Sequence, residues 1–195
     1  SHQHEPFMHT QETCVTITWM RLCAKLLAVT GDSMWADQFE KTFYNAYLAS
    51  VAADGGLFAV YTPLDGTKSE GQIHCRMHTN CCNANGPRGF LAYLDAFIRA
   101  EKETVFLNFF TTASAAVDLP RGGRAVFEIY GEYPREGDVD IRYAGGRPLG
   151  FTLALRRPVR CAEGGMKVLV NGEVVRTMVL ENDWSDARGV LSWHR

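Results

Sequence analysis

Two short stretches of the sequence carry the residue types best suited to bind a metal. "QETC" places Glu12 and Cys14 two positions apart, and "NCCNANG" places Cys81 directly before Cys82. In an extended or helix-cap conformation, side chains at i and i+2 can point to the same side, whereas deeper in a helix they lie roughly 200° apart. The four side chains offer one carboxylate and three thiolates. This sulfur-rich set favours zinc, with iron–sulfur as the next choice.

The adjacent cysteines have other interpretations. A disulfide between neighbours strains the peptide that joins them, and six cysteines in 195 residues are too sparse for a disulfide scaffold. Burial stays open: Cys14 would face a helix core while Cys81 and Cys82 pack under a loop, since free cysteine is among the most buried residue types. Adjacent ligands can reach one ion where the backbone is irregular, which the glycine and asparagines of "CCNANG" favour. Because four protein ligands close the coordination shell, residue chemistry alone favours structural zinc.

The composition is that of a globular protein that can bury a sizeable core. The chain is 46% hydrophobic and 22% charged, with a formal net charge of −2. The sequence contains no tract rich in lysine or arginine, so its charge does not indicate nucleic acid as a partner. The sequence also contains no run of 18 apolar residues, so it predicts no membrane span. The opening stretch, "SHQHEPFMHTQETC", resembles the interior of a longer protein, so we expect a fragment.

Helical spacing of apolar residues dominates the first hundred positions. Thr10 is placed to cap a helix over residues 10–29, and "TGDS" at 30–33 ends it. A second helix follows, then the extended segment "LFAVYTPL", and Gly86–Pro87 begins a third helix. The predicted apolar faces are Val15, Trp19, Leu22, Leu26 and Val29 in the first helix; Trp35, Phe39, Phe43 and Tyr47 in the second; and Phe90, Leu91, Leu94 and Phe97 in the third.

From Thr104 onward the apolar period drops to two, which predicts strands separated by turns with glycine and proline. Asn171–Gly172 lies between two β-rich runs and is a strong hairpin signal. Several short strands at this spacing indicate an antiparallel β-sandwich. The predicted fold is therefore α + β in sequence order, with helices over residues 1–100 and all or part of a sandwich over residues 101–195.

The order of several motifs resembles one enzyme family. They are "HTQETCVTITWMRLC", "ADQFEKTFYNAYLAS", "NCCNANGPRGF", "YPREGDVDIRY", "FTLALRRP" and "VLVNGE". Together they resemble the zinc-dependent β-L-arabinofuranosidases of glycoside hydrolase family 127. E-x-C followed by C-C is the most specific part of the resemblance. It implies that residues 1–100 are the C-terminal helices of an (α/α)6 catalytic barrel and that residues 101–195 begin a β-sandwich domain.

The resemblance also implies a mechanism. Glu12, Cys14, Cys81 and Cys82 match the zinc ligands, and Cys81 matches the catalytic nucleophile. A zinc-bound thiolate would attack the anomeric carbon, form a thioglycosyl intermediate, and be released by water with retention of configuration. The attacking atom would itself be a metal ligand. Catalysis would then need no open position on the zinc, although four protein ligands close its coordination shell.

Further roles follow from the same resemblance. Glu40 and Tyr61 match positions that contact the sugar. The general acid/base would lie upstream of Ser1, since Glu5 is too close to "QETC". By position rather than by resemblance, His4, His9 and His78 lie near the motifs and could hydrogen-bond sugar hydroxyls. Cys75 is close enough to the cysteine pair to compete as a ligand, although the family pattern does not call for it. The implied partner is a carbohydrate bearing L-arabinofuranosyl groups. The resemblance leaves two compartments open, the cytoplasm or the periplasm of a bacterium. Neither compartment nor oligomeric state follows from the sequence.

Two other functions remain open at this stage. The chain could be a non-catalytic, zinc-stabilised module or a truncated inactive remnant of such an enzyme. Alternatively, the strands over residues 101–195 could bind sugar by themselves, although only their predicted fold favours this.

Overall fold

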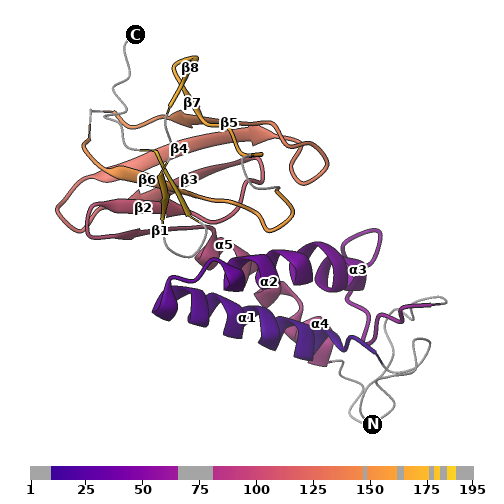
Figure 1. The fold of residues 1–195 in the computed structure, drawn as a ribbon. Coiled ribbons are helices and arrows are strands. Elements are labelled where there is room, and N and C mark those ends of the chain that lie inside the picture. Colours follow the sequence, from indigo (N-terminus) through magenta and orange to yellow (C-terminus); the bar gives the residue numbers. More distant parts are fainter. Residues whose placement is uncertain are drawn as a thin grey trace. The chain divides into compact units, whose positions relative to one another are not determined.

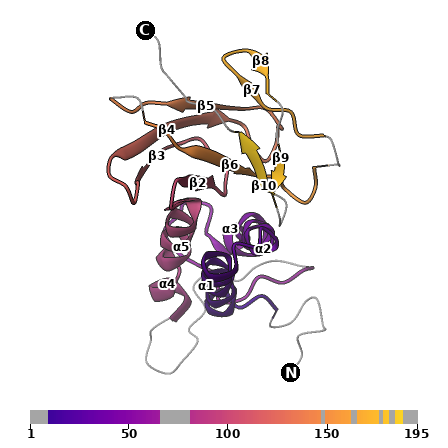
Figure 2. The same ribbon diagram turned by 60° about the vertical axis from the view of Figure 1, so that its left-hand side comes forward.

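The computed structural model describes residues 10–65, 81–146, 149–161, 165–175, 178–180 and 184–187, the last two ranges by their backbone alone. The chain divides into two compact units. We call them the helical unit, which ends at Asp95 and excludes residues 32–34, and the strand unit, which holds residues 32–34 and continues from Ala96. Figures 1 and 2 show the helices in one unit and the strands in the other.

Helix α1 (Thr13–Thr30) is capped two residues later than the sequence predicts. Glu12 is its N-cap, with φ −57° and ψ 128°, and its side chain makes no capping hydrogen bond. Thr10 does not cap the helix, because its hydroxyl instead donates to the Thr62 carbonyl oxygen over 3.3 Å. The predicted end is confirmed: Gly31 adopts a left-handed conformation with φ 69°, and its N–H bonds to the carbonyl oxygen of Leu27.

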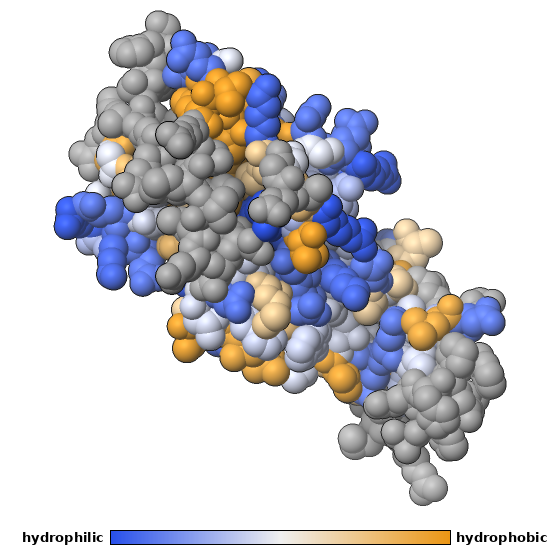
Figure 3. Space-filling model, in the orientation of Figure 1, coloured by the Kyte–Doolittle hydropathy of each residue, from blue (hydrophilic) through white to orange (hydrophobic). Residues whose placement is uncertain are grey.

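The predicted apolar face of α1 is wrong. Val15, Leu22 and Val29 are 60%, 48% and 83% exposed, and Trp19 is 39% exposed. Figure 3 shows apolar side chains along the lower edge of the molecule, where α1 lies. The buried face instead carries Thr13, Thr16, Ile17, Met20, Cys23 and Leu27. Cys23 is thus in the core, as predicted. Two faces of this helix are apolar, so periodicity alone selected the wrong one.

By length and composition, α1 is the one helix among the described residues that could cross a membrane. Core helices of soluble proteins pass the same test, and α1 has six buried side chains within the structure. Arg21 and Lys25 interrupt its apolar sequence. This is why the sequence contains no continuous run of 18 apolar residues although α1 has a high mean hydropathy.

The second predicted helix is present as three consecutive pieces: α2 (Met34–Thr42), a π-helical turn η1 (Phe43–Tyr47) and α3 (Leu48–Ser50). Its buried face agrees with the prediction, because Phe39, Phe43 and Tyr47 are all buried. The ring of Phe43 stacks on that of Tyr93, with centroids 4.2 Å apart. The π-helical turn was not predicted.

The cysteine pair lies in a single helical turn, α4 (Cys81–Asn85), followed at once by α5 (Pro87–Phe97). Pro87 opens α5 at its first position, as predicted. The predicted irregular backbone at the cysteines is wrong, since Cys81 and Cys82 are both helical. Buried Gly86 joins the two helices, and its carbonyl oxygen accepts a 2.7 Å hydrogen bond from the Tyr47 hydroxyl.

Gly86→Ala is expected to destabilise the helical unit. A Cβ at position 86 would fall inside the ring of Phe58, so either the ring or the cysteine-bearing helix must move. Overpacking of this kind costs about 1–3 kcal/mol. Chemical denaturation should show the loss, with Gly137→Ala as the control, since a Cβ at position 137 meets nothing within 4 Å. Equal stability of the two variants would contradict the packing.

The strand unit contains two larger sheets and one hairpin among its described residues. One sheet has the order β1-β2-β6-β10-β9, and the other has the order β3-β4-β5. The prediction of wholly antiparallel strands is wrong at one place, because β2 and β6 pair in parallel. The strands are β1 (Ile98–Glu101), β2 (Thr104–Leu107), β3 (Ala113–Asp118), β4 (Arg124–Gly131), β5 (Val139–Tyr143), β6 (Thr152–Arg156), β9 (Met178–Leu180) and β10 (Trp184–Ala187).

The predicted hairpin is confirmed. Strands β7 (Leu169–Val170) and β8 (Glu173–Val174) pair antiparallel around Asn171 and Gly172, whose φ angles are 53° and 84°. Positive φ at both central residues is what such a two-residue turn requires. Elsewhere in the strand unit, the Phe127 ring packs against Tyr143 and Phe151 in a buried aromatic cluster.

Candidate metal centre

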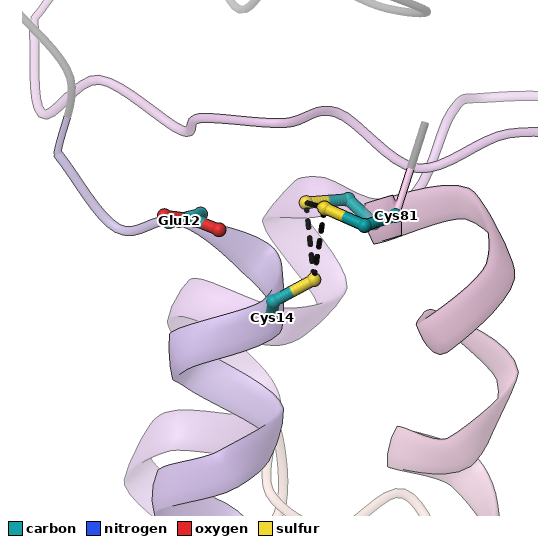
Figure 4. Close-up of side chains that lie close together, drawn as sticks. Glu12, Cys14 and Cys81 are labelled. Carbon is teal, nitrogen blue, oxygen red and sulfur yellow. Dashed lines mark hydrogen bonds between the residues drawn. The ribbon is translucent and has the colours of Figure 1, made fainter. Parts of the chain in front are cut away.

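Four side chains meet at the end of the helical unit where α1 and α4 begin. One ligand atom from each of Glu12, Cys14, Cys81 and Cys82 lies within 4.8 Å of the others. The Cys14 sulfur is 3.5 Å from that of Cys81 and 3.4 Å from that of Cys82. Figure 4 shows the three sulfurs facing one another with the Glu12 side chain beside them. Sequence reasoning grouped the same four residues.

These sulfur separations match a tetrahedral zinc site. Zn–S bonds of about 2.3 Å in a tetrahedron place neighbouring sulfurs about 3.8 Å apart. The Sγ atoms of Cys81 and Cys82 are 3.9 Å apart, and the two distances from Cys14 are slightly shorter. Three thiols and one carboxylate in this arrangement could therefore hold one zinc ion without large rearrangement.

The start of α1 explains why Glu12 and Cys14 share a side. Glu12 has the extended ψ of a cap residue, so its side chain does not follow the helical rotation that begins at Thr13. Cys14, in the first turn, then points toward the same region. This is the cap geometry that the two-residue spacing favours. On the other side, Cys81 and Cys82 bring their sulfurs together although their backbone is helical.

The three thiols differ in accessibility. Cys82 is fully buried and Cys14 is half-buried, whereas Cys81 is exposed. Burial raises the pKa of Cys82 to about 12, and the neighbouring cysteines add to the increase. Burial is also the main cause that raises the pKa of Cys14. Without a metal, the Cys14 and Cys82 thiols are therefore protonated at neutral pH.

Tyr61 lies near the cluster, and Glu40 is not part of it. Burial raises the pKa of Tyr61, and electrostatic interaction with Glu12, Cys82 and Cys81 raises it further. Glu40 is half-buried on α2. Glu5, His4, His9, His78 and Cys75 lie outside the described residues.

Sequence reasoning missed the residues that support the cluster. Thr13 N–H donates to the Val60 carbonyl oxygen, and the Thr13 hydroxyl donates to that of Ala59. The Asn83 side-chain oxygen accepts the Phe58 N–H. Both residues stand directly beside predicted ligands, and this adjacency is the signal that could have identified them.

The family of the helical segment follows from a comparison with family models. Residues 2–95 match the catalytic domain of the GH127 β-L-arabinofuranosidases. Residues 2–95 belong to this family. The match ends at the same residue as the helical unit, Asp95, and it contains all four residues of the cluster. No curated protein matches the sequence.

Two solved structures show that the fold shared with GH127 proteins extends beyond this segment. One is Ara127N-Se, a GH127 β-L-arabinofuranosidase from Geobacillus stearothermophilus T6, with a TM-score of 0.71 and 23% identity over 92% of this chain. The other is a glycoside hydrolase with a TM-score of 0.77 and 23% identity over 94% of this chain. The chain spans only 29% and 31% of these proteins' lengths.

Zinc binding by this GH127 segment is expected to strengthen steeply with pH. The Cys14 and Cys82 thiols must each lose a proton before they can bind zinc, because their pKa values lie above neutrality. With at least these two protons released, the apparent association constant should rise at least about 100-fold per pH unit between roughly pH 6 and 8. Competition with a chromophoric chelator, corrected for its own protonation, measures the slope.

Cys14→Ser is the control for this pH dependence. The variant removes one of the two thiols, so the slope should fall by about one proton. A wild-type slope clearly below two protons per zinc would contradict the prediction.

Proposed function

We propose that the chain supplies the metal-binding part of a retaining glycoside hydrolase that acts on β-L-arabinofuranosides. The observation that carries the proposal is the unequal exposure of the adjacent cysteines. Cys81 is exposed at the cluster, whereas Cys82 is fully buried. A substrate can therefore approach the sulfur of Cys81 but not that of Cys82. This supports Cys81 as nucleophile and metal ligand, with Glu12, Cys14 and Cys82 as ligands alone.

The reaction proposed for Cys81 has two steps. Its sulfur attacks the anomeric carbon, while the glycosidic oxygen leaves with a proton from a general acid, giving a thioglycosyl intermediate. Water then gives a proton to the general-acid residue, now acting as a base, attacks the anomeric carbon from the opposite side and releases the thiolate. Two inversions give net retention. Bound zinc would keep the Cys81 thiol ionised, as a thiolate nucleophile requires.

The neighbouring residues fit this assignment in different degrees. Tyr61 follows Val60, whose carbonyl oxygen accepts the Thr13 N–H at the start of α1, and its proposed sugar contact rests on the family resemblance. The sugar contact proposed for Glu40 rests on the family resemblance alone. The general acid is proposed to lie outside this chain. In the same proposal, α1 to α5 are the last helices of an (α/α)6 barrel and the two larger sheets belong to a β-sandwich.

A second candidate function rests on the closed donor set. Three sulfurs and one carboxylate fill a tetrahedral shell, which is typical of zinc that only stabilises a fold. In this alternative the chain is a zinc-stabilised module or an inactive remnant. Its zinc would be retained, and no hydrolysis would depend on Cys81.

The test uses the full-length protein that contains this chain. Zinc content is measured first, and hydrolysis of an aryl β-L-arabinofuranoside is then followed by proton NMR. We expect one zinc ion per chain and the β-anomer of arabinose as the first product. Zinc without hydrolysis would support the module instead. If the α-anomer appears first, the double-displacement route is wrong.

A further inference from the structure

A short segment, residues 58–62, contacts both elements that carry the proposed ligands. We call it the bracing segment. On the α1 side, the Thr13 N–H donates to the Val60 carbonyl oxygen over 3.0 Å. The Thr13 hydroxyl donates to the Ala59 carbonyl oxygen over 2.6 Å. The Thr62 N–H donates to the Thr10 carbonyl oxygen over 3.1 Å. The bonds of Thr10 and Thr13 lie on either side of Glu12, and Thr13 directly precedes Cys14.

The α4 side of the bracing segment is bound mainly through Asn83. Its side-chain oxygen accepts the Phe58 N–H over 2.6 Å. The Cys82 sulfur lies 3.9 Å from the Val60 carbonyl oxygen. The Phe58 ring is packed so closely on Gly86 that no Cβ fits there. Cys82 and Asn83 are consecutive in α4, so a bond at Asn83 constrains the neighbouring ligand directly.

The two halves of the cluster need such a link because they are remote in sequence. Cys14 and Cys81 are 67 residues apart, while their sulfurs lie 3.5 Å apart. A metal site tolerates only a few tenths of an ångström in its ligand distances. Residues that orient ligands are therefore nearly as important for metal affinity as the ligands themselves.

We propose that Asn83 is a positioning residue, which sets the distance between the α1 and α4 halves of the cluster through the Phe58 amide. This inference rests on the proposed metal-binding role, but it concerns the protein's own geometry and holds in the metal-free state as well. The Asn83 oxygen accepts the bond that ties α4 to the bracing segment. The bracing segment in turn holds the start of α1 through Thr13.

The first experiment measures proximity of the thiols without any metal. Metal-free full chain is treated with dibromobimane, which becomes fluorescent when it links two thiols, and the linked peptides are identified by mass spectrometry. Wild type should link Cys14 to Cys81 or Cys82. Asn83→Ala should reduce the rate of this link about tenfold. Asn83→Asp retains an acceptor oxygen for the Phe58 amide and should keep the wild-type rate.

A matched control is Asn45→Ala. The Asn45 side chain also makes a backbone hydrogen bond, donating to the Lys41 carbonyl oxygen over 2.7 Å, but it is exposed and on another helix. Its loss should leave the linking rate unchanged. If Asn83→Ala fails to accumulate as folded protein, Asn83→Ser replaces it, since a hydroxyl on a shorter side chain should give an intermediate rate.

Zinc affinity supplies the second readout. Asn83→Ala should bind zinc about 10–100-fold more weakly than wild type, the usual effect of losing a residue that orients a ligand. Asn83→Asp should bind at least as tightly as wild type. A variant that merely weakens the fold would lower the unfolding midpoint without changing zinc affinity in the folded state.

The outcomes separate this inference from the proposed function. Equal linking rates in Asn83→Ala, Asn45→Ala and wild type would overturn the positioning role, whatever the zinc result. If wild type links Cys14 to α4 in an Asn83-dependent way but binds no zinc, the metal proposal fails and the positioning role stands. Reduced linking in Asn83→Asp as well as in Asn83→Ala would also overturn the positioning role. The acceptor oxygen for the Phe58 amide would then not determine the distance between the thiols.

Discussion

Cys81→Ser is expected to lower turnover of an aryl β-L-arabinofuranoside by a factor on the order of 10³ or more, because the two-step covalent route loses its nucleophile. The serine hydroxyl is a much weaker nucleophile and a poorer zinc ligand than the cysteine thiolate. Glu12, Cys14 and Cys82 remain in place, so we expect zinc to be retained with reduced affinity. Turnover and zinc content are measured on the same preparation of the full-length protein.

Cys82→Ser is the matched comparison for this prediction. Cys82 is adjacent, helical and a member of the same cluster, yet it is fully buried. Its replacement should weaken zinc binding strongly and reduce turnover only through loss of the metal. Excess zinc should therefore restore part of the activity of Cys82→Ser and none of that of Cys81→Ser. Full activity in Cys81→Ser would end the nucleophile assignment.

A covalent adduct provides the direct readout for the same step. Acid quenching during turnover should trap a peptide that contains Cys81 and has gained the mass of one pentosyl group. The adduct should be absent from Cys81→Ser. An adduct on any other residue of wild type would place the nucleophile elsewhere.

The cluster could be predicted because its residue types and caps are local features. An E-x-C pair at the start of a helix and two adjacent cysteines together suit metal binding without knowledge of the fold. The supporting bond from the Phe58 amide to Asn83 could not be predicted, because it joins a backbone donor to a side chain 25 residues away. Such contacts depend on how two segments dock, and local sequence does not specify docking.

The buried faces of the helices also differ in how well the local sequence predicts them. The face of the second predicted helix was correct, since only one of its sides is apolar and Phe39, Phe43 and Tyr47 are buried. In α1 two sides are apolar, so only the packing of other elements decides that Ile17 is inside and Val15 outside.

Strand direction in the sheet depends on long-range pairing in a comparable way. The alternating period identified β2 and β6 as strands, but it carries no information on their relative direction. Thr104 pairs with Thr152 across a long intervening segment, and such a connection permits a parallel pair. Short hairpins such as β7–β8 leave no such freedom.

Zinc is expected to stabilise the wild-type chain substantially, and Cys14→Ala is expected to remove most of this effect. The metal would bind residues 67 positions apart in sequence, in an arrangement that only the folded chain provides. At a free zinc concentration about 1,000 times the dissociation constant, linkage predicts about 4 kcal/mol of added stability. For a chain of this size, this corresponds to an increase in the unfolding midpoint on the order of 10 °C.

Cys23→Ala separates loss of the site from loss of core packing. Cys23 lies on the same helix as Cys14 and is fully buried, but it is not part of the cluster. Its truncation should lower the midpoint with and without zinc by similar amounts and leave the zinc-dependent shift intact. Thermal unfolding with zinc and with chelator measures both effects. A zinc-dependent shift in Cys14→Ala as large as that of wild type would mean that the metal binds elsewhere, because two cysteines and Glu12 leave the shell one sulfur short.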